Sequence, residues 1–381
     1  MKVAIIGGGA SGVLCALKLK KLNSLIDVTI FEATNKLLKK VSISGNGRCN
    51  LGNENIFSNA FLNPAIIDEM AEYKDASKEF FREIGLLTTT DNEGRIYPLS
   101  NQASNVVEYL GKLLFFHHVK VNLNHPVKKI IKTKNSYQIF DEVYDYVVIS
   151  TGSNAGINYD DSYDLINDLG LETSELRPGL VGFRIQEDLK MISGVRTSVI
   201  AKAFGKETCG EVIFKDDGIS GICIMDLSIF KNNESLLSLD LFPNYSANDL
   251  LTYAKQKLLL DKNLRLHNLL SGTINSKIVN YINQKFENVQ VNSLKDEDIF
   301  EYIAQFKAFN LTIKSTYDKI NAQVICGGVN FSEVDNFELI KYPHMYITGE
   351  VLNQAGICGG YNLWFAFTTG IMVAEAILKK V

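Results

Sequence analysis

Three glycines near the amino terminus have the spacing of a phosphate-binding turn. Gly7, Gly9 and Gly12 form a G-x-G-x-x-G pattern between a short apolar run, residues 3–6, and a stretch with apolar residues at helical spacing, residues 13–22. The first glycine permits a tight turn out of a strand, the second lets the backbone approach a pyrophosphate, and the third lets the helix pack closely on the strand. The pattern favours dinucleotide binding; the alternative is a glycine-rich turn without a ligand.

The elements around these glycines supply the rest of such a site. The free N–H groups and positive dipole end of the expected helix attract phosphate, and Ala10 and Ser11, between the glycines, are expected to contact the cofactor. The segment DVTIFEA, residues 27–33, is typical of a second strand, which ends at Glu32. A carboxylate there can accept hydrogen bonds from both ribose hydroxyls, which disfavours a 2′-phosphate. The predicted fold class is α/β, with a Rossmann-like unit at the amino terminus.

A second glycine-rich stretch, VSISGNGRCN, occupies residues 41–50. Helices and strands both disfavour glycines two residues apart. A nicotinamide dinucleotide domain would continue directly into further strand–helix units, whereas FAD proteins use a long connection here to hold the pyrophosphate and ribityl chain from a second side. We therefore expect FAD, contacted from this stretch by Gly45, Gly47, Arg48, Cys49 and Asn50. The alternative is a surface loop.

Two later segments also favour FAD. YDYVVISTGSNAG, residues 144–156, is typical of a buried strand, and it ends in Thr151 and Gly152, which we expect close to the cofactor. In the second segment a strand precedes Gly349 and Glu350, and this acid can bond to the ribityl hydroxyls.

A further glycine-rich turn opens the last expected helix. Gly359, Gly360, Tyr361 and Asn362 are expected beneath the isoalloxazine ring, where a helix amino terminus stabilises negative charge on the reduced flavin. No second G-x-G-x-x-G follows a strand in the sequence, so a dedicated NAD(P)H domain is not expected. NAD(P)H, if it is the transient electron donor, must then enter the substrate pocket itself.

These residues resemble the bacterial flavoproteins called NAD(P)/FAD-dependent oxidoreductases, which include aminoacetone oxidase and the bile-acid ring reductases (3-dehydro-bile acid 4,6-reductases). The resemblance rests on five ordered motifs: GNGRCN, NEGRIYPLSNQASNVVEYL, GISGICIMDLS, CGGVNFSEVD and GEVLNQAGICGGYNLWFAF. It implies non-covalent FAD bound as in two-dinucleotide-binding-type flavoproteins, with Val127 among the cofactor contacts. Asn46 stands where the family has glycine, Ile222 where it has proline, and Cys358 where it has threonine or serine. These departures concern the substrate side more than cofactor binding.

The resemblance also implies a domain organisation. An FAD domain is formed by both chain ends, residues 1–178 and 319–381, and the middle of the chain is an insertion. Residues 179–243, with about 310–318, read as strands between turn residues and match a β-barrel-like substrate subdomain. Residues 244–309 have helical periodicity and match a helical subdomain.

The composition limits the partners. The chain has 39 Lys and Arg against 43 Asp and Glu, a formal net charge of −4, which argues against non-specific binding to nucleic acid or anionic membranes. Six cysteines without a C-x-x-C pair suggest a reducing compartment, and we expect a cytoplasmic protein. Five histidines show no metal-ligand spacing, so no metal is expected. The apolar segment 362–378 carries polar residues and is expected to be a buried helix, not a membrane span.

The flavin chemistry leaves two directions open. An oxidase would take a hydride from an amine carbon and pass electrons to O₂, whereas a reductase would take electrons from NAD(P)H and reduce an activated C=C. Alternatives of another class are a flavin-dependent RNA-modifying or RNA-binding protein and a non-catalytic flavin-bound scaffold. We expect an FAD-dependent oxidoreductase of a small organic substrate, favour the reductase, and leave the oligomeric state open.

No side chain stands out as a catalytic acid or base. We expect the substrate pocket between the open flavin face and the inserted domain, lined by Tyr361 and Asn362 and by residues near 181–184 and 218–224. Tyr361 and Asn362 are the candidates for a catalytic role, although packing against the ring is the stronger expectation for Tyr361. Cys358, next to this turn, is expected to be neither a redox thiol nor a covalent flavin ligand.

Overall fold

The computed structural model describes residues 1–156 and 163–380 and divides the chain into two compact units. The first unit contains both ends of the chain, Met1–Arg177 and Val324–Val381, and the second is Pro178–Gln323. The expected domain bounds, 1–178 with 319–381, remain a proposal about which parts fold independently.

The first unit is built on a seven-stranded sheet with the order β19-β20-β21-β10-β1-β2-β6. Its strands are β1 (Lys2–Ile6), β2 (Asp27–Phe31), β6 (Lys120–Asn122), β10 (Tyr146–Ile149), β19 (Val334–Asp335), β20 (Glu338–Leu339) and β21 (Met345–Ile347). The strands from β21 to β6 are parallel, and β19 and β20 add an antiparallel edge. The central strands are short apolar runs buried on both faces, as a parallel sheet requires. The predicted Rossmann-like fold is confirmed.

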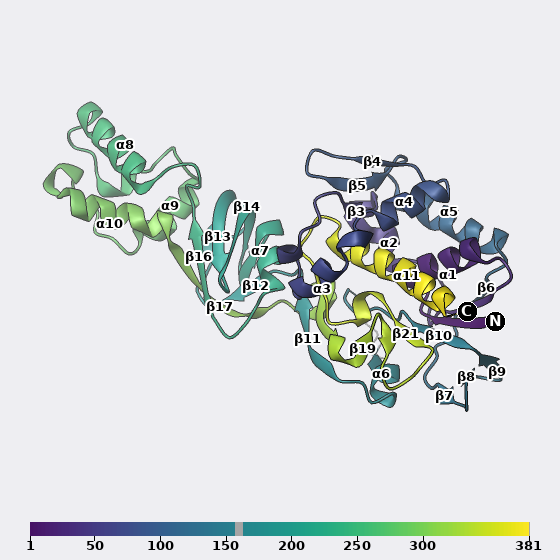
Figure 1. The fold of residues 1–381 in the computed structure, drawn as a ribbon. Helices are drawn as coiled ribbons and strands as arrows, with labels where there is room; N and C mark the ends of the chain where they lie inside the picture. The colour runs from purple at the N-terminus through teal and green to yellow at the C-terminus, as the bar shows by residue number, and fades with distance from the viewer. Residues whose placement is uncertain (157–162, 381) are drawn as a thin grey trace. The chain divides into compact units, whose positions relative to one another are not determined.

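Helices α1 (Ala10–Leu22) and α11 (Tyr361–Lys379) lie side by side in this unit (Figure 1). Their backbones touch, because a Cβ added to Gly370 would lie 2.3 Å from the carbonyl oxygen of Ser11. Within the described part of the chain, α11 alone has the length and composition of a membrane span, yet 67% of its apolar window is buried inside the structure. Its apolar surface therefore serves the core, as expected from the sequence.

Further helices and small sheets complete the first unit. The remaining helices are α2 (Lys39–Ile43), α3 (Pro64–Glu69), α4 (Ala76–Glu83), α5 (Ala103–Phe116) and α6 (Asp164–Asp168). The small sheets contain β3 (Gly52–Asn53), β4 (Thr88–Thr90) and β5 (Arg95–Pro98), then β7 (Ile131–Lys132), β8 (Tyr137–Ile139) and β9 (Glu142–Tyr144), and β11 (Thr173–Gly179) with β18 (Val324–Val329). The β3-β5-β4 sheet matters most here, because β3 directly follows the second glycine-rich stretch.

The second unit contains a closed six-stranded barrel, which confirms the predicted β-barrel-like insertion. Its strands, in barrel order, are β12 (Phe183–Ile185), β15 (Gly218–Ser220), β14 (Lys206–Lys215), β13 (Arg196–Ala203), β16 (Leu236–Asp240) and β17 (Phe309–Thr316). Helix α7 (Ile222–Ser228) follows β15. Ile222, which stands where the family has proline, is the first residue of α7, a position where proline is common because its missing N–H has no helical partner there.

A helical part follows β16 in the second unit, as predicted. It consists of α8 (Ala247–Leu260), α9 (Ser276–Asn283) and α10 (Asp296–Lys307). Ser246 and Asp249 form a reciprocal capping box that starts α8. Buried side chains of these helices join one core with the barrel, including Leu250, Ile278 and Phe306.

Candidate functional site

The carboxyl ends of four parallel strands meet in one row. The register pairs Ile6 of β1 with Phe31 of β2 and Ile149 of β10, and Ile149 with Ile347 of β21. The predicted site residues at this edge follow these four: Gly7, Glu32, Thr151 and Gly349. Ligands of open parallel sheets bind outside the carboxyl ends of the strands, so the sheet brings the predicted contacts to the expected place.

The three glycines of the G-x-G-x-x-G pattern differ in what surrounds them. A Cβ added to Gly7, which has φ +108°, would lie 2.2 Å from the carbonyl oxygen of Ser150. A Cβ on Gly12 would lie 2.2 Å from the carbonyl oxygen of Gly7. A Cβ on Gly9, the residue before α1, would meet no atom within 4 Å. The fold itself explains the first and third glycines but not the second, whose contact with a pyrophosphate stays a prediction.

Glu32 is held in a defined orientation at the end of β2. One carboxylate oxygen, Oε2, accepts a hydrogen bond from the N–H of Gly8 at 2.8 Å, and Oε1 accepts from the N–H and hydroxyl of Thr34 at 2.8 and 2.7 Å. The backbone of His125 donates to the carbonyl oxygen of Glu32 at 2.9 Å, which brings the segment leading to the buried Val127 alongside. The carboxylate is therefore fixed next to the glycine turn, where the ribose contact is predicted.

The second glycine-rich loop (residues 41–50) is shaped by left-handed backbone. Gly45, Asn46, Gly47 and Cys49 have φ values of +57°, +55°, +83° and +64°. Asn46, which replaces a family glycine, keeps this conformation because asparagine tolerates it better than other non-glycine residues. A Cβ on Gly45 would lie 2.9 Å from the backbone nitrogen of Asn50, but a Cβ on Gly47 would meet nothing within 4 Å. Gly47 therefore resembles Gly9, because no atom of the described residues occupies the space beside either one.

Arg48 and Cys49 lie in different surroundings although they are adjacent. Arg48 is exposed, and its guanidinium carbon lies 4.2 Å from the centroid of the Tyr97 ring. Cys49 is fully buried, and burial raises the pKa of its thiol to about 11. The thiol is thus protonated at neutral pH, the backbone N–H of Cys49 donates to the carbonyl oxygen of Ser44 at 3.0 Å, and contact between Cys49 and a cofactor stays a prediction. Contact between Arg48 and a cofactor stays a prediction.

Two buried polar atoms at the site lack a partner. Asn50 Oδ1 and Thr151 Oγ1 accept and donate no hydrogen bond to any residue that the structure describes. Asn50 is 9% exposed, and its Oδ1 lies where a Cβ on Gly360 would be 2.6 Å away. Gly152, next to Thr151, has φ +64° and open space at its Cβ position. Buried polar atoms are seldom left unpaired in folded proteins, so a ligand that bonds to these two atoms would satisfy them. A buried atom without a partner among the described residues also occurs in Tyr163, Tyr346, Asn353 and Thr368.

Glu350 takes part in a network that the sequence did not suggest. Lys40 of α2 donates to Glu350 Oε2 at 2.7 Å and to the hydroxyl of Ser153 at 2.9 Å, and this hydroxyl donates to Glu350 Oε1 at 2.7 Å. The backbone N–H of Ile325 adds a contact to Oε1 at 3.2 Å. The network joins α2 to the segments that follow β10 and β21. Lys40 and Ser153 were missed because nothing in their local sequence distinguishes them from surface residues.

The turn before α11 is held by close backbone packing and by side-chain hydrogen bonds. Gly359 and Gly360 have φ values of +118° and +98°, and a Cβ on Gly360 would lie 2.3 Å from the carbonyl oxygen of Gly52. Asn362 donates from Nδ2 to the carbonyl oxygen of Gly356 and accepts at Oδ1 from its N–H, both at 2.8 Å. The side chain of Asn362 therefore holds the loop that leads into the helix.

Tyr361 is buried and packs among aromatic rings. Its ring lies edge-to-face with Phe57 and Phe61, at centroid distances of 5.8 and 5.6 Å, and its hydroxyl donates to the carbonyl oxygen of Asn55 at 3.2 Å. Cys358, nearby in the chain, is partly exposed and forms no disulfide with a described residue. The contacts of Tyr361 favour packing over proton transfer, and the substrate pocket expected around it stays a prediction.

Comparisons with known proteins agree with this geometry. The family described as "HI0933-like protein Rossmann domain" matches residues 1–376. The chain is 29% identical to the 3-dehydro-bile acid delta(4,6)-reductase of Clostridium scindens, with 100% of this chain and 99% of that protein aligned. It is 25% identical to a protein of Haemophilus influenzae named ribosomal RNA dihydrouridine synthase, and 24% identical to one of Escherichia coli with the same name, again over nearly the full lengths.

One solved structure extends the likeness in fold. The 3-ketosteroid delta1-dehydrogenase from Sterolibacterium denitrificans, in complex with 1,4-androstadiene-3,17-dione, aligns with 100% of this chain and 99% of its own, at a TM-score of 0.54 and 10% identity. At that identity the match shows a shared fold alone.

Proposed function

The chain belongs to the HI0933-like Rossmann domain family, and from this premise we propose that it binds FAD non-covalently and reduces an activated C=C bond. The broader predictions from sequence, the family resemblance and a flavin-dependent oxidoreductase, are confirmed. The choice of direction and substrate goes further and rests on the relatives' names and the net charge, and NAD(P)H as donor is part of the proposal.

The observation that carries the proposal is the combination of open space and unpaired polar atoms. Gly9, Gly47 and Gly152 have empty Cβ positions, and Asn50 Oδ1 and Thr151 Oγ1 are buried without a partner among the described residues. They come from three segments that are distant in sequence, residues 7–12, 41–50 and 150–152, and the first and third of these meet at the sheet edge. A dinucleotide that reaches from the turn at Gly9 toward α11 would fill the space and satisfy both atoms, so these residues fit FAD.

The residues divide the work of holding such a cofactor. The N–H groups at the start of α1 would bind the pyrophosphate, and the carboxylate of Glu32 the ribose hydroxyls. The amino terminus of α11, preceded by Gly360, would direct its positive dipole end toward the flavin ring system. When bound, the flavin supplies hydride transfer; the chain orients it, shields it and places N–H groups where negative charge develops.

The relatives' names favour reduction over oxidation. A bile-acid delta(4,6)-reductase and a dihydrouridine synthase are both named for saturating a ring C=C that is conjugated to a carbonyl group. Two relatives with different substrates thus share one bond type, and that bond type is what we propose for this chain. The amine oxidase alternative has no such support.

Two candidate substrates, a small organic molecule and ribosomal RNA, differ in size. The more similar relative is named for a small molecule, and the net charge of −4 disfavours a large nucleic-acid surface, so we propose a small organic enone or dienone as the substrate. Uridine in ribosomal RNA is the second candidate, because two relatives named for it align over nearly the whole chain.

One experiment tests these points in order. The purified protein should be yellow and release FAD, not FMN, on acid or heat treatment. Anaerobic mixing with NADH or NADPH should bleach the flavin, and reoxidation should be faster with a 3-oxo-4-ene steroid than with unmodified ribosomal RNA. Release of FMN or of no flavin contradicts the cofactor assignment, whereas faster reoxidation by the RNA selects the second candidate. Bleaching by an amine instead of NAD(P)H would reverse the proposed direction.

A further inference from the structure

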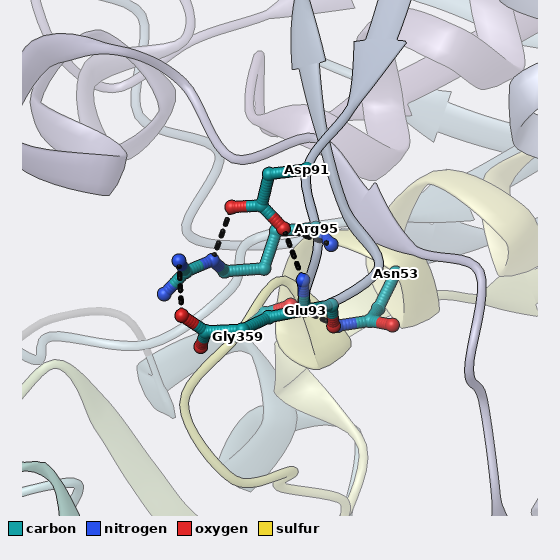
Figure 2. A network of polar contacts seen from close by, with 5 residues as sticks. All are labelled: Asn53, Asp91, Glu93, Arg95 and Gly359. Carbon is teal, nitrogen blue, oxygen red and sulfur yellow. Dashed lines mark hydrogen bonds and ion pairs between the residues drawn. The ribbon is translucent and has the colours of Figure 1, made fainter.

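The motif NEGRIYP, residues 92–98, has no role in the site described so far, yet it surrounds one buried polar side chain. Asn53, at the end of β3, is 5% exposed. Its Nδ2 donates to the carbonyl oxygen of Gly359 at 3.0 Å and makes a longer contact of 3.5 Å with that of Glu93 (Figure 2). Its Oδ1 accepts from the N–H of Asn55 at 2.8 Å. The side chain thus links the β4–β5 turn to the turn before α11.

Gly94 makes room for this side chain. The residue has φ +78°, and a Cβ there would lie 2.7 Å from Asn53 Oδ1 and 2.4 Å from Asn55 Nδ2. A larger residue at this position would displace the amide from its place below the turn. The glycine of the motif is therefore explained by its positive φ and by the side chains of Asn53 and Asn55.

Arg95 closes the same turn from the other side. Its Nε donates to Asp91 Oδ2 and its second terminal nitrogen to Glu93 Oε1, both at 2.8 Å (Figure 2). Asp91 Oδ1 accepts from the backbone N–H of Glu93 and of Arg95 at 3.0 Å. These bonds fix the loop whose carbonyl oxygen lies next to Asn53, so the amide has a rigid support.

The bond to Gly359 has a consequence for the neighbouring N–H. The structure contains no cis peptide bond among its described residues, and in a trans peptide the C=O and N–H groups point in opposite directions. With the carbonyl oxygen of Gly359 held by Asn53, the N–H of Gly360 is directed to the other side of the turn. Gly360 is the residue that precedes α11, so Asn53 sets how the helix amino terminus is presented.

We infer that Asn53 is a positioning residue that orients the Gly359–Gly360 peptide and thereby raises the midpoint potential of the bound flavin. The inference rests on the proposed function, in which the amino terminus of α11 faces the flavin. N–H groups and a helix dipole directed at the pyrimidine edge stabilise the negative charge that reduction places there. Without the hydrogen bond from Asn53, the Gly359–Gly360 peptide is free to turn and its N–H group is no longer held toward the flavin. Reduction of the flavin then becomes less favourable.

The test compares Asn53→Ala with Asn92→Ala, an exposed residue of the same turn that serves as the matched control. With FAD bound, Asn53→Ala should make the reduction equilibrium about tenfold less favourable, a fall of about 30 mV for a two-electron couple, while Asn92→Ala leaves the potential unchanged. In the apoprotein, amide hydrogen exchange of residues 356–364 should become at least tenfold faster in Asn53→Ala alone.

Two outcomes would overturn the inference. One is an Asn53→Ala protein that holds FAD at the wild-type potential. The other, decisive where that variant retains too little FAD for titration, is unchanged exchange of residues 356–364 in its apoprotein. Failure of the proposed function looks different: the wild-type protein itself then binds no FAD, and the exchange measurement still decides whether Asn53 orders the turn.

Discussion

The two sides of the candidate site are held by different interactions. The sheet-edge side consists of residues 7–12 and 150–152, whose positions are fixed by strand register and by close packing of backbone against backbone. A Cβ added to Gly7 or to Gly12 would lie only 2.2 Å from a backbone carbonyl oxygen. On the loop side, residues 40–53 and 356–362, single side chains such as Lys40 and Asn53 hold turns of left-handed backbone. We therefore expect substitutions on the sheet-edge side to destabilise the fold. Substitutions on the loop side should leave the protein folded but displace the groups expected to hold the cofactor.

The largest effect is expected at Gly12. Its Cβ would lie 2.2 Å from the carbonyl oxygen of Gly7, and backbone cannot move aside as a flexible side chain does. Gly12→Ala should lower the free energy of unfolding by roughly 3 kcal/mol or more, measured by urea denaturation of the apoprotein. Gly9→Ala is the matched control, because its Cβ enters open space: stability should stay within about 0.5 kcal/mol while FAD affinity falls. Equal losses of stability in Gly12→Ala and Gly9→Ala would contradict the claim that the fold requires a glycine at position 12 but not at position 9.

This asymmetry also explains how far the sequence could predict the structure. The sheet-edge side follows from local properties: apolar runs, glycine spacing and an acid at a strand end. The parallel register then brings Gly7, Thr151 and Gly349 into one row without further information. The fold class was predictable for the same reason, since strand and helix periods can be recognised one segment at a time. The inserted barrel was expected because the family resemblance implied it, and the strand-like pattern of residues 179–243 agreed with it.

The loop side could not be predicted in the same way. Asn53 and Gly359 are 306 residues apart, and Lys40 and Glu350 are 310 apart, so no local pattern indicates either pair. Tyr361 was expected to pack against the flavin ring, and the two rings that it contacts in the structure, Phe57 and Phe61, come from a distant part of the chain. Such pairs become visible only when the chain has folded.

A smaller effect is expected from Lys40. The side chains of Lys40 and Glu350 are 32% and 18% exposed, so the ion pair is partly shielded from water. Lys40→Met leaves Glu350 with the hydroxyl of Ser153 and one N–H, and should lower the free energy of unfolding by about 1–2 kcal/mol. The exposed Lys39, changed to Met, should have no effect.

A double-mutant cycle sharpens this prediction. Lys40→Met and Glu350→Gln should show a coupling energy of about 1 kcal/mol in urea denaturation, because each removes the same interaction. Additive losses would mean that the ion pair contributes nothing and that the loop side is held by other contacts.

A pH effect of similar size is expected from the buried thiol of the loop side. Burial raises the pKa of Cys49 from 9.0 to about 11, so above pH 9 the unfolded chain loses this proton while the folded chain keeps it. Stability from this group is complete below pH 9 and is lost as the pH rises toward 11, because the unfolded state then binds fewer protons. Burial also raises the pKa of Cys223 and Cys326 to about 11, so wild-type stability should fall across this window.

The contribution of Cys49 can be isolated by substitution. Cys49→Ala should make the fall between pH 9 and pH 11 shallower by roughly 1 kcal/mol per pH unit, measured from urea unfolding at each pH. Cys209→Ala, at an exposed position, should leave the slope as it is. A slope that is identical in Cys49→Ala and wild type would show that this thiol ionises alike in both states.

The smallest effect on folding, and the sharpest separation of folding from binding, is expected at Arg48. Its exposed guanidinium stacks on Tyr97 at 4.2 Å, an interaction worth about 0.5–1 kcal/mol at an exposed site, so Arg48→Ala should barely change the free energy of unfolding. The same residue follows the open space at Gly47 and is expected to contact the cofactor, so the variant should lose FAD retention or shift the flavin potential. Arg82→Ala provides a control, since this exposed arginine of α4 lies outside the loop side. An Arg48→Ala protein with wild-type FAD affinity, potential and turnover would make Arg48 a surface residue and confine the loop-side contacts to backbone and Asn50.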